Sequence, residues 1–292
     1  MIQRKRGAVG GGRISVLLLS WLLFSGFVLG MVYHVDKAGW NWFKLTGYDT
    51  TLPEDHSELL DLTPQEWIKH FPMFSYDPKD DRLVLKKGEY EIDATIVVPG
   101  ETLLKMEPGT NLRFHAGRSL ISHSPIFAQG TEADPIVFTA QNKWLKWGAV
   151  GLVKTKKSVF DHVVFEYGRR ASVNGIDFLA GLSLIESDVE IRNCRFLNMF
   201  GKDAVNVRFA NALIKNNIFK NAYKDGVDCD GATGEISDNE FINCGDEGID
   251  LSENFNIRVY NNKVLDERGG RIAAENDLRE ILSLNTLGYL HN

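Results

Sequence analysis

From Leu83 onwards, the chain consists of short apolar runs separated by turn-forming residues. The runs are rich in Val, Ile and Phe, and Gly, Asn and Asp lie between them. Within the runs, apolar and polar positions alternate, as in the stretch from residue 102 to residue 140. A period of two is typical of a strand with one buried face, so the pattern predicts an all-β domain over residues 81–273.

The late strands recur at a nearly constant interval. Four similar segments follow one another along the chain: IRNCRF (191–196), IKNNIF (214–219), ISDNEF (236–241) and VYNNKV (259–264). An earlier member, FDHVVF (160–165), precedes the first of them by a longer step, which indicates an insertion around Arg169 to Ala180. A step of about 22 residues is typical of a leucine-rich repeat or of a β-helix coil.

The residues inside each repeat favour the β-helix. The repeats lack the L-x-x-L-x-L pattern and contain no helical stretch. In a parallel β-helix, equivalent residues of successive coils stack about 4.8 Å apart. Residues 81–273 would form a solenoid of about eight such coils.

Asparagines recur at two positions of the repeat. We expect them at corners, where Asn tolerates left-handed backbone and bonds to its copies in neighbouring coils. His162 takes the place of one of them in an earlier coil and is interpreted as a structural substitute. The first column contains Asn193, Asn216, Asp238 and Asn261, and the second contains Asn198, Asn221 and Asn243.

The predicted early strands contain short motifs that resemble those of a known superfamily. Thr102-Leu103, Pro108-Gly109-Thr110 and the segment from Gly130 to Thr139 are similar to the opening coils of right-handed parallel β-helix proteins of the pectate-lyase-like superfamily. The resemblance covers residues 81–273 and implies the fold, but this fold carries many functions. The late coils are also similar to β-helix segments of spore-coat CotH-type proteins, although the chain has no kinase motif that would imply their activity.

Both ends of a solenoid need caps, and helices are predicted at both. Thr63, Pro64 and Glu66 have the pattern of an N-cap, a first helical residue and a capping box. The apolar stripe of this helix would consist of Trp67, Ile68 and Phe71. Residues 274–292 are expected to form a C-terminal helical cap, whose apolar side would contain Leu278, Ile281, Leu282 and Leu284.

The first residues of the chain have a different pattern. A basic segment, residues 1–13, precedes an uncharged run of twenty residues from Ile14 to Tyr33. Such a run spans about 30 Å as a helix, the thickness of a bilayer core. We therefore expect a transmembrane helix at 14–33 with a cytoplasmic N-terminus, then a linker and capping helix at 34–80. A cleaved signal peptide is the alternative, but it would be shorter and end in a small-residue site.

The net charge of −6 and the sequence pI of about 5.7 argue against a nucleic-acid-binding protein. The chain has three cysteines, which are too few and too irregularly spaced for a disulfide framework or a zinc site. We interpret them as small buried apolar residues. They are Cys194, Cys229 and Cys244.

An acidic motif is repeated in the late coils. Asp225-Gly226-Val227-Asp228 returns one repeat later as Glu247-Gly248-Ile249-Asp250. Alternation would turn Asn206, Asp228 and Asp250 outward in one column, and Arg208, Asp230 and Ser252 in the next. Gly226 and Gly248 would form a strip without side chains, which a ligand can approach closely. The outer acids are expected in turns; they are Asp225, Asp246 and Glu247.

Three uses of this exposed acidic patch are open. Asp228 and Asp250 would lie near 5 Å apart, roughly one coil spacing. With Asp230 as support, they could act as an acid and a base or nucleophile in glycoside hydrolysis. Asp228, Asp230 and Asp250 could instead bind calcium. The third use is a solvated surface whose charge is offset by Arg208 and Arg271.

Known activities of the superfamily have few counterparts in this sequence. Of the signatures of polygalacturonase-like hydrolases, Asn-Thr-Asp, His-Gly and Arg-Ile-Lys are absent, and the dipeptide Asp-Asp occurs only at Asp80-Asp81, ahead of the repeats. A pectate-lyase-like elimination would need calcium and a basic Arg or Lys, for which Arg208 and Arg271 are the candidates. No catalytic triad, P-loop, dinucleotide or zinc motif is present.

The sequence therefore predicts a membrane-anchored, extracytoplasmic β-helix that binds or processes an envelope or extracellular polysaccharide. The polar flank of the solenoid would suit a polymer with a regular repeat. As ligand-binding residues we expect Asn206, Arg208, Gly226, Gly248 and Arg271. The alternative is a structural or assembly scaffold whose flank binds a protein partner at the membrane.

Overall fold

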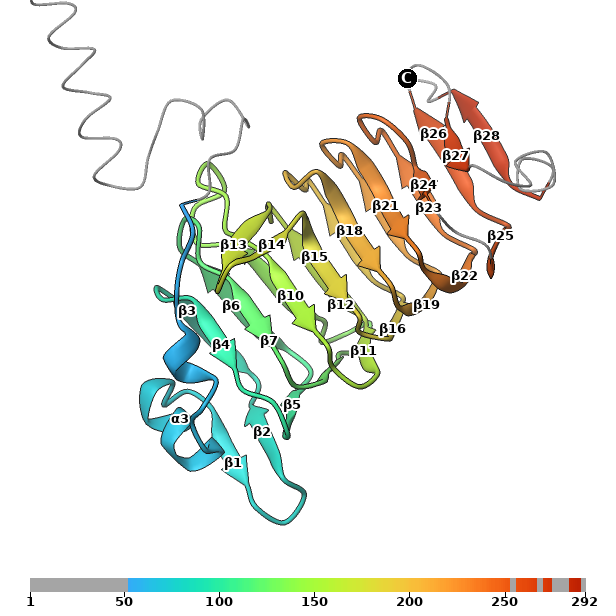
Figure 1. Cartoon of the computed structure of the whole chain (residues 1–292). Coiled ribbons are helices and arrows are strands. Elements are labelled where there is room, and N and C mark those ends of the chain that lie inside the picture. Colours follow the sequence, from blue (N-terminus) through green and yellow to red (C-terminus); the bar gives the residue numbers. More distant parts are fainter. Residues whose placement is uncertain (1–51, 253–255, 267–269, 275–283, 290–292) are drawn as a thin grey trace, which may run out of the picture. The chain divides into compact units, whose positions relative to one another are not determined.

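A computed structural model describes residues 52–252, 256–266, 270–274 and 284–289. From Arg82 the chain winds into a parallel β-solenoid in which each coil contributes one strand to each of three sheets (Figure 1). This architecture confirms the expected all-β fold of about eight coils. The predicted transmembrane helix at 14–33 lies outside the described residues. Within those residues, no helix has both the length and the apolar composition needed to cross a membrane.

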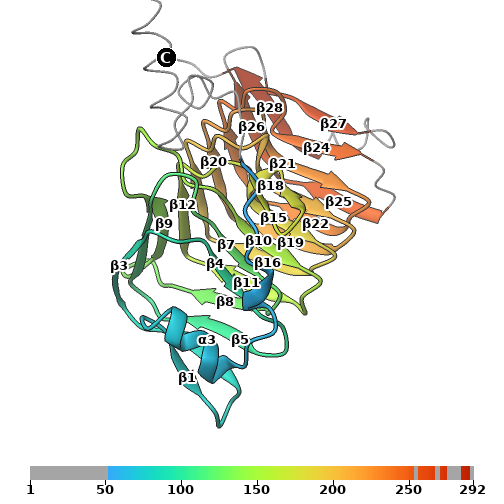
Figure 2. The same cartoon turned by 60° about the vertical axis from the view of Figure 1, so that its left-hand side comes forward.

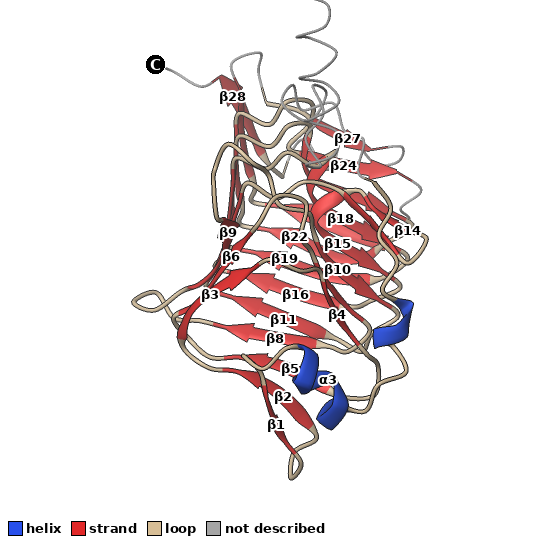
Figure 3. Ribbon diagram, turned by 90° about the vertical axis from the view of Figure 1, so that its left-hand side faces the viewer, coloured by secondary structure: helices blue, strands red, loops and turns tan. Residues whose placement is uncertain are grey.

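Sheet 1 is seen face-on in Figure 3, with β1 antiparallel to β2 and the other strands parallel. Its strands are β1 (Ser75–Asp77), β2 (Arg82–Leu85), β5 (Leu103–Met106), β8 (Ile126–Gln129), β11 (Ser158–Asp161), β16 (Val189–Arg192), β19 (Asn211–Lys215), β22 (Thr233–Ser237) and β25 (Asn256–Tyr260). Sheet 2 contains β3 (Gly88–Ile92), β6 (Thr110–Phe114), β9 (Ile136–Ala140), β12 (Val163–Glu166), β17 (Arg195–Leu197), β20 (Ile218–Lys220), β23 (Glu240–Ile242), β26 (Lys263–Asp266) and β28 (Thr286–Tyr289).

Sheet 3 carries the acidic motif, and Figure 1 shows most of its strands side by side. Its strands are β4 (Ile96–Val98), β7 (Leu120–Ser122), β10 (Val150–Val153), β15 (Ala180–Ile185), β18 (Asp203–Arg208), β21 (Asp225–Asp230), β24 (Ile249–Ser252) and β27 (Ile272–Ala274). The insertion expected around residues 169–180 is an antiparallel hairpin of β13 (Ala171–Val173) and β14 (Ile176–Phe178).

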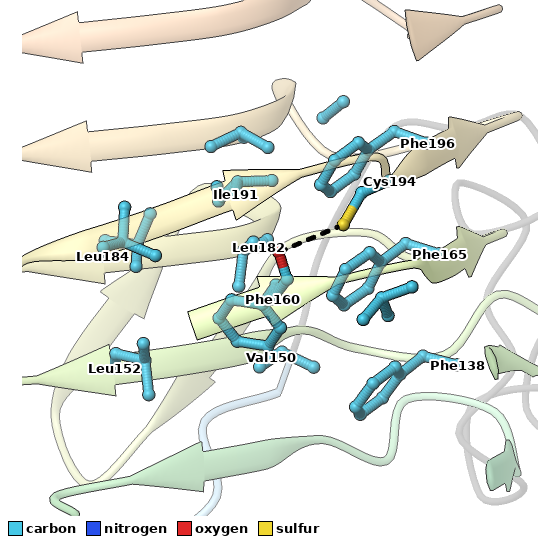
Figure 4. Close-up of a cluster of buried hydrophobic side chains, with 14 of the residues drawn as sticks. Phe138, Val150, Leu152, Phe160, Phe165, Leu182, Leu184, Ile191, Cys194 and Phe196 are labelled. Atoms are coloured by element: carbon cyan, nitrogen blue, oxygen red, sulfur yellow. Dashed lines mark hydrogen bonds between the residues drawn. The ribbon is translucent and has the colours of Figure 1, made fainter. Parts of the chain in front are cut away.

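A column of phenylalanines forms the centre of the core. Alternation along the sheet 2 strands turns one fully buried Phe per coil inward, and five of them stack with ring centroids 4.7–4.9 Å apart. Figure 4 shows three of these rings beside Leu and Ile side chains of the other two sheets. Since stacking repeats at the coil spacing, each ring packs against the coil before it and the coil after it. The five are Phe138, Phe165, Phe196, Phe219 and Phe241.

The corner prediction is confirmed. Both Asn columns have positive φ, between 53° and 58°, and His162 has φ of 50° in the same role. In the second column, Asn221 Nδ2 donates to Asn198 Oδ1 at 2.9 Å, and Asn243 Nδ2 donates to Asn221 Oδ1 at 3.1 Å. These hydrogen bonds join successive coils, so the columns have a structural explanation.

A second Asn ladder lies inside the solenoid, one residue after the first corner column. In the buried interior, Asn217 Nδ2 donates to Asn239 Oδ1 and Asn239 Nδ2 donates to Asn262 Oδ1, each at 2.9 Å. The same Asn oxygens accept from backbone N–H groups of the preceding coil. Cys194 holds this position one coil earlier, and its Sγ lies 3.5 Å from Phe160 O (Figure 4).

The cysteines behave as expected from the sequence. All three are buried and none forms a disulfide. Burial raises the pKa of the thiols of Cys194 and Cys244 to about 12, which keeps both protonated. They therefore act as small core residues.

The N-terminal end is capped by the short helix α3 (Pro64–His70), which Figure 2 shows beside the first strands and which follows the 3₁₀ turn η1 (Ser57–Leu59). Thr63 and Glu66 form the predicted capping box. Trp67 is fully buried in the main core and donates from Nε1 to Val97 O at 2.6 Å. The prediction of a helical cap at this end is confirmed.

The C-terminal end differs from the prediction. Thr286–Tyr289 form strand β28, which pairs in parallel with β26, so the solenoid continues beyond residue 273. The helix expected over 274–292 is therefore wrong for this segment. Its expected apolar residues Leu278, Ile281 and Leu282 lie outside the described residues.

Candidate functional site

The outer face of sheet 3 changes character along the solenoid. One register column joins Val97, Ile121, Gly151, Ser183, Asn206, Asp228, Asp250 and Ala273. Its early members are covered by a second apolar cluster, in which Leu59 of η1 and Phe178 of β14 pack with Val97 and Ile121. Beyond Gly151 the column is polar from Ser183 to Asp250 and ends at Ala273. The polar part, on β18, β21 and β24, is called the acidic face below.

The acidic face is less exposed than the sequence suggested. Asn206 and Asp228 have 0% and 2% of their surface exposed, and Asp250 is half-buried. Lys202, in the turn before β18, places Nζ 3.1 Å from Asp228 Oδ2, and Asn206 Nδ2 lies 3.3 Å from the same oxygen. The expectation of an open acidic patch is therefore wrong at Asn206 and Asp228, because neighbouring side chains cover both.

The glycine strip is also a wrong prediction. A Cβ built on Gly226 would lie 2.4 Å from Cδ1 of Phe241, and one on Gly248 would lie 2.6 Å from Cγ1 of Val264. Both neighbours belong to the core, so these positions face inward and leave no surface for a ligand. Glycine is needed there because the strand passes close to the Phe column.

An inward position for Gly226 breaks the alternation of the strands. Ala204 and Val205 are both core residues, and Asp203 pairs with Asp225 one position earlier. Two successive inward residues leave the aspartate before them on the outer side. The carboxylate oxygens of Asp203, Asp225 and Asp228 consequently lie within 4.8 Å of one another. Asp225 is thus a buried strand residue and not the expected turn-former.

Sequence reasoning missed Asp203, although a signal was present. Lys202-Asp203-Ala204-Val205 repeats as Lys224-Asp225-Gly226-Val227 one coil later. Asp203 is completely buried. Burial, then the charges of Asp228 and Asp225, raise the pKa of its carboxyl to about 10.

The carboxyls at the rim of the acidic face are also perturbed. Burial, followed by the negative charge of Asp228, raises the pKa of Asp250 and that of Asp230. A hydrogen bond from Asn206 opposes this rise at Asp230. Because each charge disfavours the next, protons are held more tightly here than by an isolated aspartate.

The two arginines do not offset Asp228 and Asp250 directly. Arg208 donates from Nη2 to Asp177 O of the hairpin at 2.7 Å. Arg271 lies 2.5 Å from Asp246 Oδ1 and 3.5 Å from Glu247 Oε1, beside the turn before β24. The compensating cation at Asp228 is Lys202, which sequence reasoning did not identify. Beside Arg271, burial and then the negative charge of Asp246 raise the pKa of the Glu247 carboxyl to about 7.

An exposed aromatic residue lies at the end of the acidic face. Phe209 follows Arg208 at the end of β18, is 64% exposed and has φ of 53°. A Cβ on Gly231 of the next coil would lie 2.7 Å from its ring, so the ring rests on the backbone of that glycine. In other coils, the equivalent left-handed corner is occupied by Lys154, Glu186 and Gly231. A bulky side chain rarely occupies such a position and is a reason to suspect function.

Of the residues predicted from the sequence, the structure brings together Asn206, Asp228, Asp230 and Asp250. It adds four residues that the sequence did not assign to the site: Asp203, Asp225, Lys202 and Phe209. Three predicted residues do not belong to this group: Arg271, Gly226 and Gly248. Asp228 pairs in register with Asp250, as expected for a carboxylate pair on adjacent coils. The side chain of Ser252 lies outside the described structure. Catalysis and calcium binding by these residues stay predictions.

Comparison with known proteins concerns the fold. No curated protein matches the chain. No solved structure matches it either. The expected likeness of the late coils to CotH-type proteins finds no support in these comparisons. Residues 158–287 match the family model described as "Right handed beta helix region". Together with the three parallel sheets, this match supports a right-handed parallel β-helix.

Proposed function

We propose that this protein binds a polysaccharide across the acidic face of sheet 3. The observation that carries the proposal is Phe209, an exposed ring held in a left-handed corner beside Arg208 and Asp230. The apolar face of a sugar ring can stack on such an aromatic surface, while carboxylates bind its hydroxyl groups. An exposed ring costs little conformational entropy on binding, since it is already fixed against Gly231.

The shape of the site favours a polymer over a single sugar. The members of the acidic face that reach the surface are Phe209 at the end of β18, Asp230 on β21 and Asp250 on β24, and these adjacent coils lie about 4.8 Å apart. Tyr223, 46% exposed, lies in the turn before β21, so aromatic side chains are present at both ends of this strand. A chain of sugars can contact several coils at once.

The charge of the site indicates which polymers to test. Asp230 and Asp250 are half-buried at the surface, and Lys202 and Arg208 are the basic residues beside them. An excess of carboxylates repels anionic polymers at low salt. We therefore expect neutral or amino-sugar polysaccharides to bind more tightly than uronic-acid polysaccharides.

Phe209→Ala should weaken binding of the preferred polysaccharide at least tenfold, because the stacking surface is removed. Isothermal titration calorimetry with the full chain, over a panel of neutral, amino-sugar and acidic polymers, measures this effect. Trp144→Ala is the matched control: Trp144 is 75% exposed but lies in the turn before β10. Equal losses in both variants would contradict a specific site at Phe209.

Incubating the full chain with the same panel of polymers separates the remaining candidate functions. Hydrolysis would use Asp250, which pairs in register with Asp228 and whose pKa is raised by burial and then by the charge of that neighbour. It would release reducing ends, and Asp228→Asn/Asp250→Asn would abolish this release. A scaffold would bind no polymer and would co-purify with a membrane protein.

We also propose that residues 14–33 anchor the protein in a membrane with the solenoid on the outer side. The support is the basic segment 1–13 followed by twenty uncharged residues. The full chain should stay in the membrane pellet during alkaline carbonate extraction and pass into detergent. Release into the carbonate supernatant would exclude an integral anchor.

A further inference from the structure

Three aspartates form a compact buried cluster beneath the acidic face. Asp203, Asp225 and Asp228 have 0%, 3% and 2% of their surface exposed, and one oxygen of each lies within 4.8 Å of the others. They come from the adjacent strands β18 and β21. Buried carboxylates at this separation repel strongly, so each extra negative charge needs compensation.

The protein supplies only part of this compensation. Lys202 Nζ reaches Asp228 Oδ2 at 3.1 Å, and Asp225 Oδ1 accepts from the backbone N–H of Glu247 at 2.8 Å. Neither oxygen of Asp203 has a hydrogen-bond partner within the described part of the chain. Oδ1 of Asn206, which is equally buried, has none there either.

Buried polar oxygens without a partner are rare in native proteins and indicate a missing ligand, water or ion. One proton shared between Asp203 and Asp225 would satisfy one oxygen of Asp203 and leave the second unpaired. A cation held by all three carboxylates would satisfy Asp203 and remove the repulsion within the cluster. The geometry therefore favours a cation over a proton.

We propose that Asp203, Asp225 and Asp228 bind calcium and so join two adjacent coils. The cluster offers only carboxylate oxygens, which are the ligands of hard cations. Calcium suits the site better than magnesium because it accepts irregular oxygen geometry. This set shares one residue with the Asp228, Asp230 and Asp250 set expected from the sequence, and it lies deeper.

Calcium titration of the full chain, after chelator treatment and without polysaccharide, tests this site. Calorimetry should show one calcium bound per chain, and thermal unfolding should shift upward by about 5–10 °C at a hundredfold excess over Kd. Magnesium chloride, titrated in parallel, should bind at least tenfold more weakly. Asp203→Asn should weaken calcium binding at least tenfold.

Asp230→Asn is the matched control, since it removes a carboxyl of the same face outside the cluster. Its calcium affinity should stay within threefold of the unchanged chain. The proposal is overturned if the unchanged chain binds no calcium, if Asp203→Asn binds as tightly as it does, or if Asp230→Asn loses binding equally. Should Asp203→Asn not fold, Asp225→Asn takes its place with the same expectations.

This site is independent of the polysaccharide proposal. Calcium binding without any polymer binding would support the metal site and contradict the function. Polymer binding by a chain that binds no calcium would support the proposed function and contradict the metal site.

Discussion

Phe219→Ala is expected to lower the free energy of unfolding by about 3–5 kcal/mol, the usual cost of removing a buried aromatic ring. Phe219 is fully buried and stacks between Phe196 at 4.8 Å and Phe241 at 4.7 Å. Its ring therefore contributes to two coil-to-coil interfaces, and in a solenoid such nearest-neighbour interfaces carry much of the stability. The strands on either side fix the spacing of the neighbouring rings, so they cannot close the cavity.

Denaturant unfolding of the full chain measures this loss. Phe209→Ala is the control of the same chemistry: its ring is exposed, so its removal should change stability by no more than about 0.5 kcal/mol. A loss below about 1 kcal/mol for Phe219→Ala would mean that the coils can repack around the gap, contrary to a rigid column.

The sequence predicted the solenoid because the fold repeats its physical requirements in every coil. A left-handed corner needs Asn, Gly or a tolerated substitute such as His162, and an inward Phe must recur at the coil spacing. Both requirements leave the same residue types at the same place in each repeat. The capping helix could also be predicted, since Thr63, Pro64 and Glu66 match the local pattern of a helix N-terminus with a capping box.

The acidic face was only partly predictable because one irregularity changes the orientation of its residues. A period of two assigns Gly226 to the outer side and Asp225 to a turn. The consecutive core residues Ala204 and Val205 interrupt that period, so residues before the break exchange faces. Nothing in the sequence marks the position of such a break. Its consequences, an inward Gly226 and an outward Asp203, required the structure.

Other features depend on side-chain reach. Lys202 lies in a turn, and the sequence does not show that its ammonium bends back to Asp228. Arg271 lies 21 residues after Asp250, on the neighbouring coil, but it pairs with Asp246 and Glu247. Long flexible side chains choose among several acidic neighbours, and local spacing does not determine the choice.

Asn239→Ala is expected to cost about 3–5 kcal/mol, more than a typical polar substitution, because it removes the centre of the buried Asn ladder. Oδ1 of Asn239 accepts from N and Nδ2 of Asn217, both at 2.9 Å. Its Nδ2 donates to Ile214 O and Asn262 Oδ1, both at 2.9 Å. Alanine would leave the N–H of Asn217 and the carbonyl of Ile214 buried without these partners, at about 1–3 kcal/mol each.

The neighbouring corner column supplies the control, and the contrast shows why adjacent asparagines have unequal importance. Asn261→Gly removes one exposed hydrogen bond of 3.3 Å to Asp238 and keeps a residue that accepts φ of 55°. Its cost should stay below about 1 kcal/mol in the same denaturant titration. Similar losses for the two variants would mean that water enters the solenoid at the ladder. A large loss confined to Asn239→Ala would show that the inward asparagine, rather than the left-handed corner, holds successive coils in register.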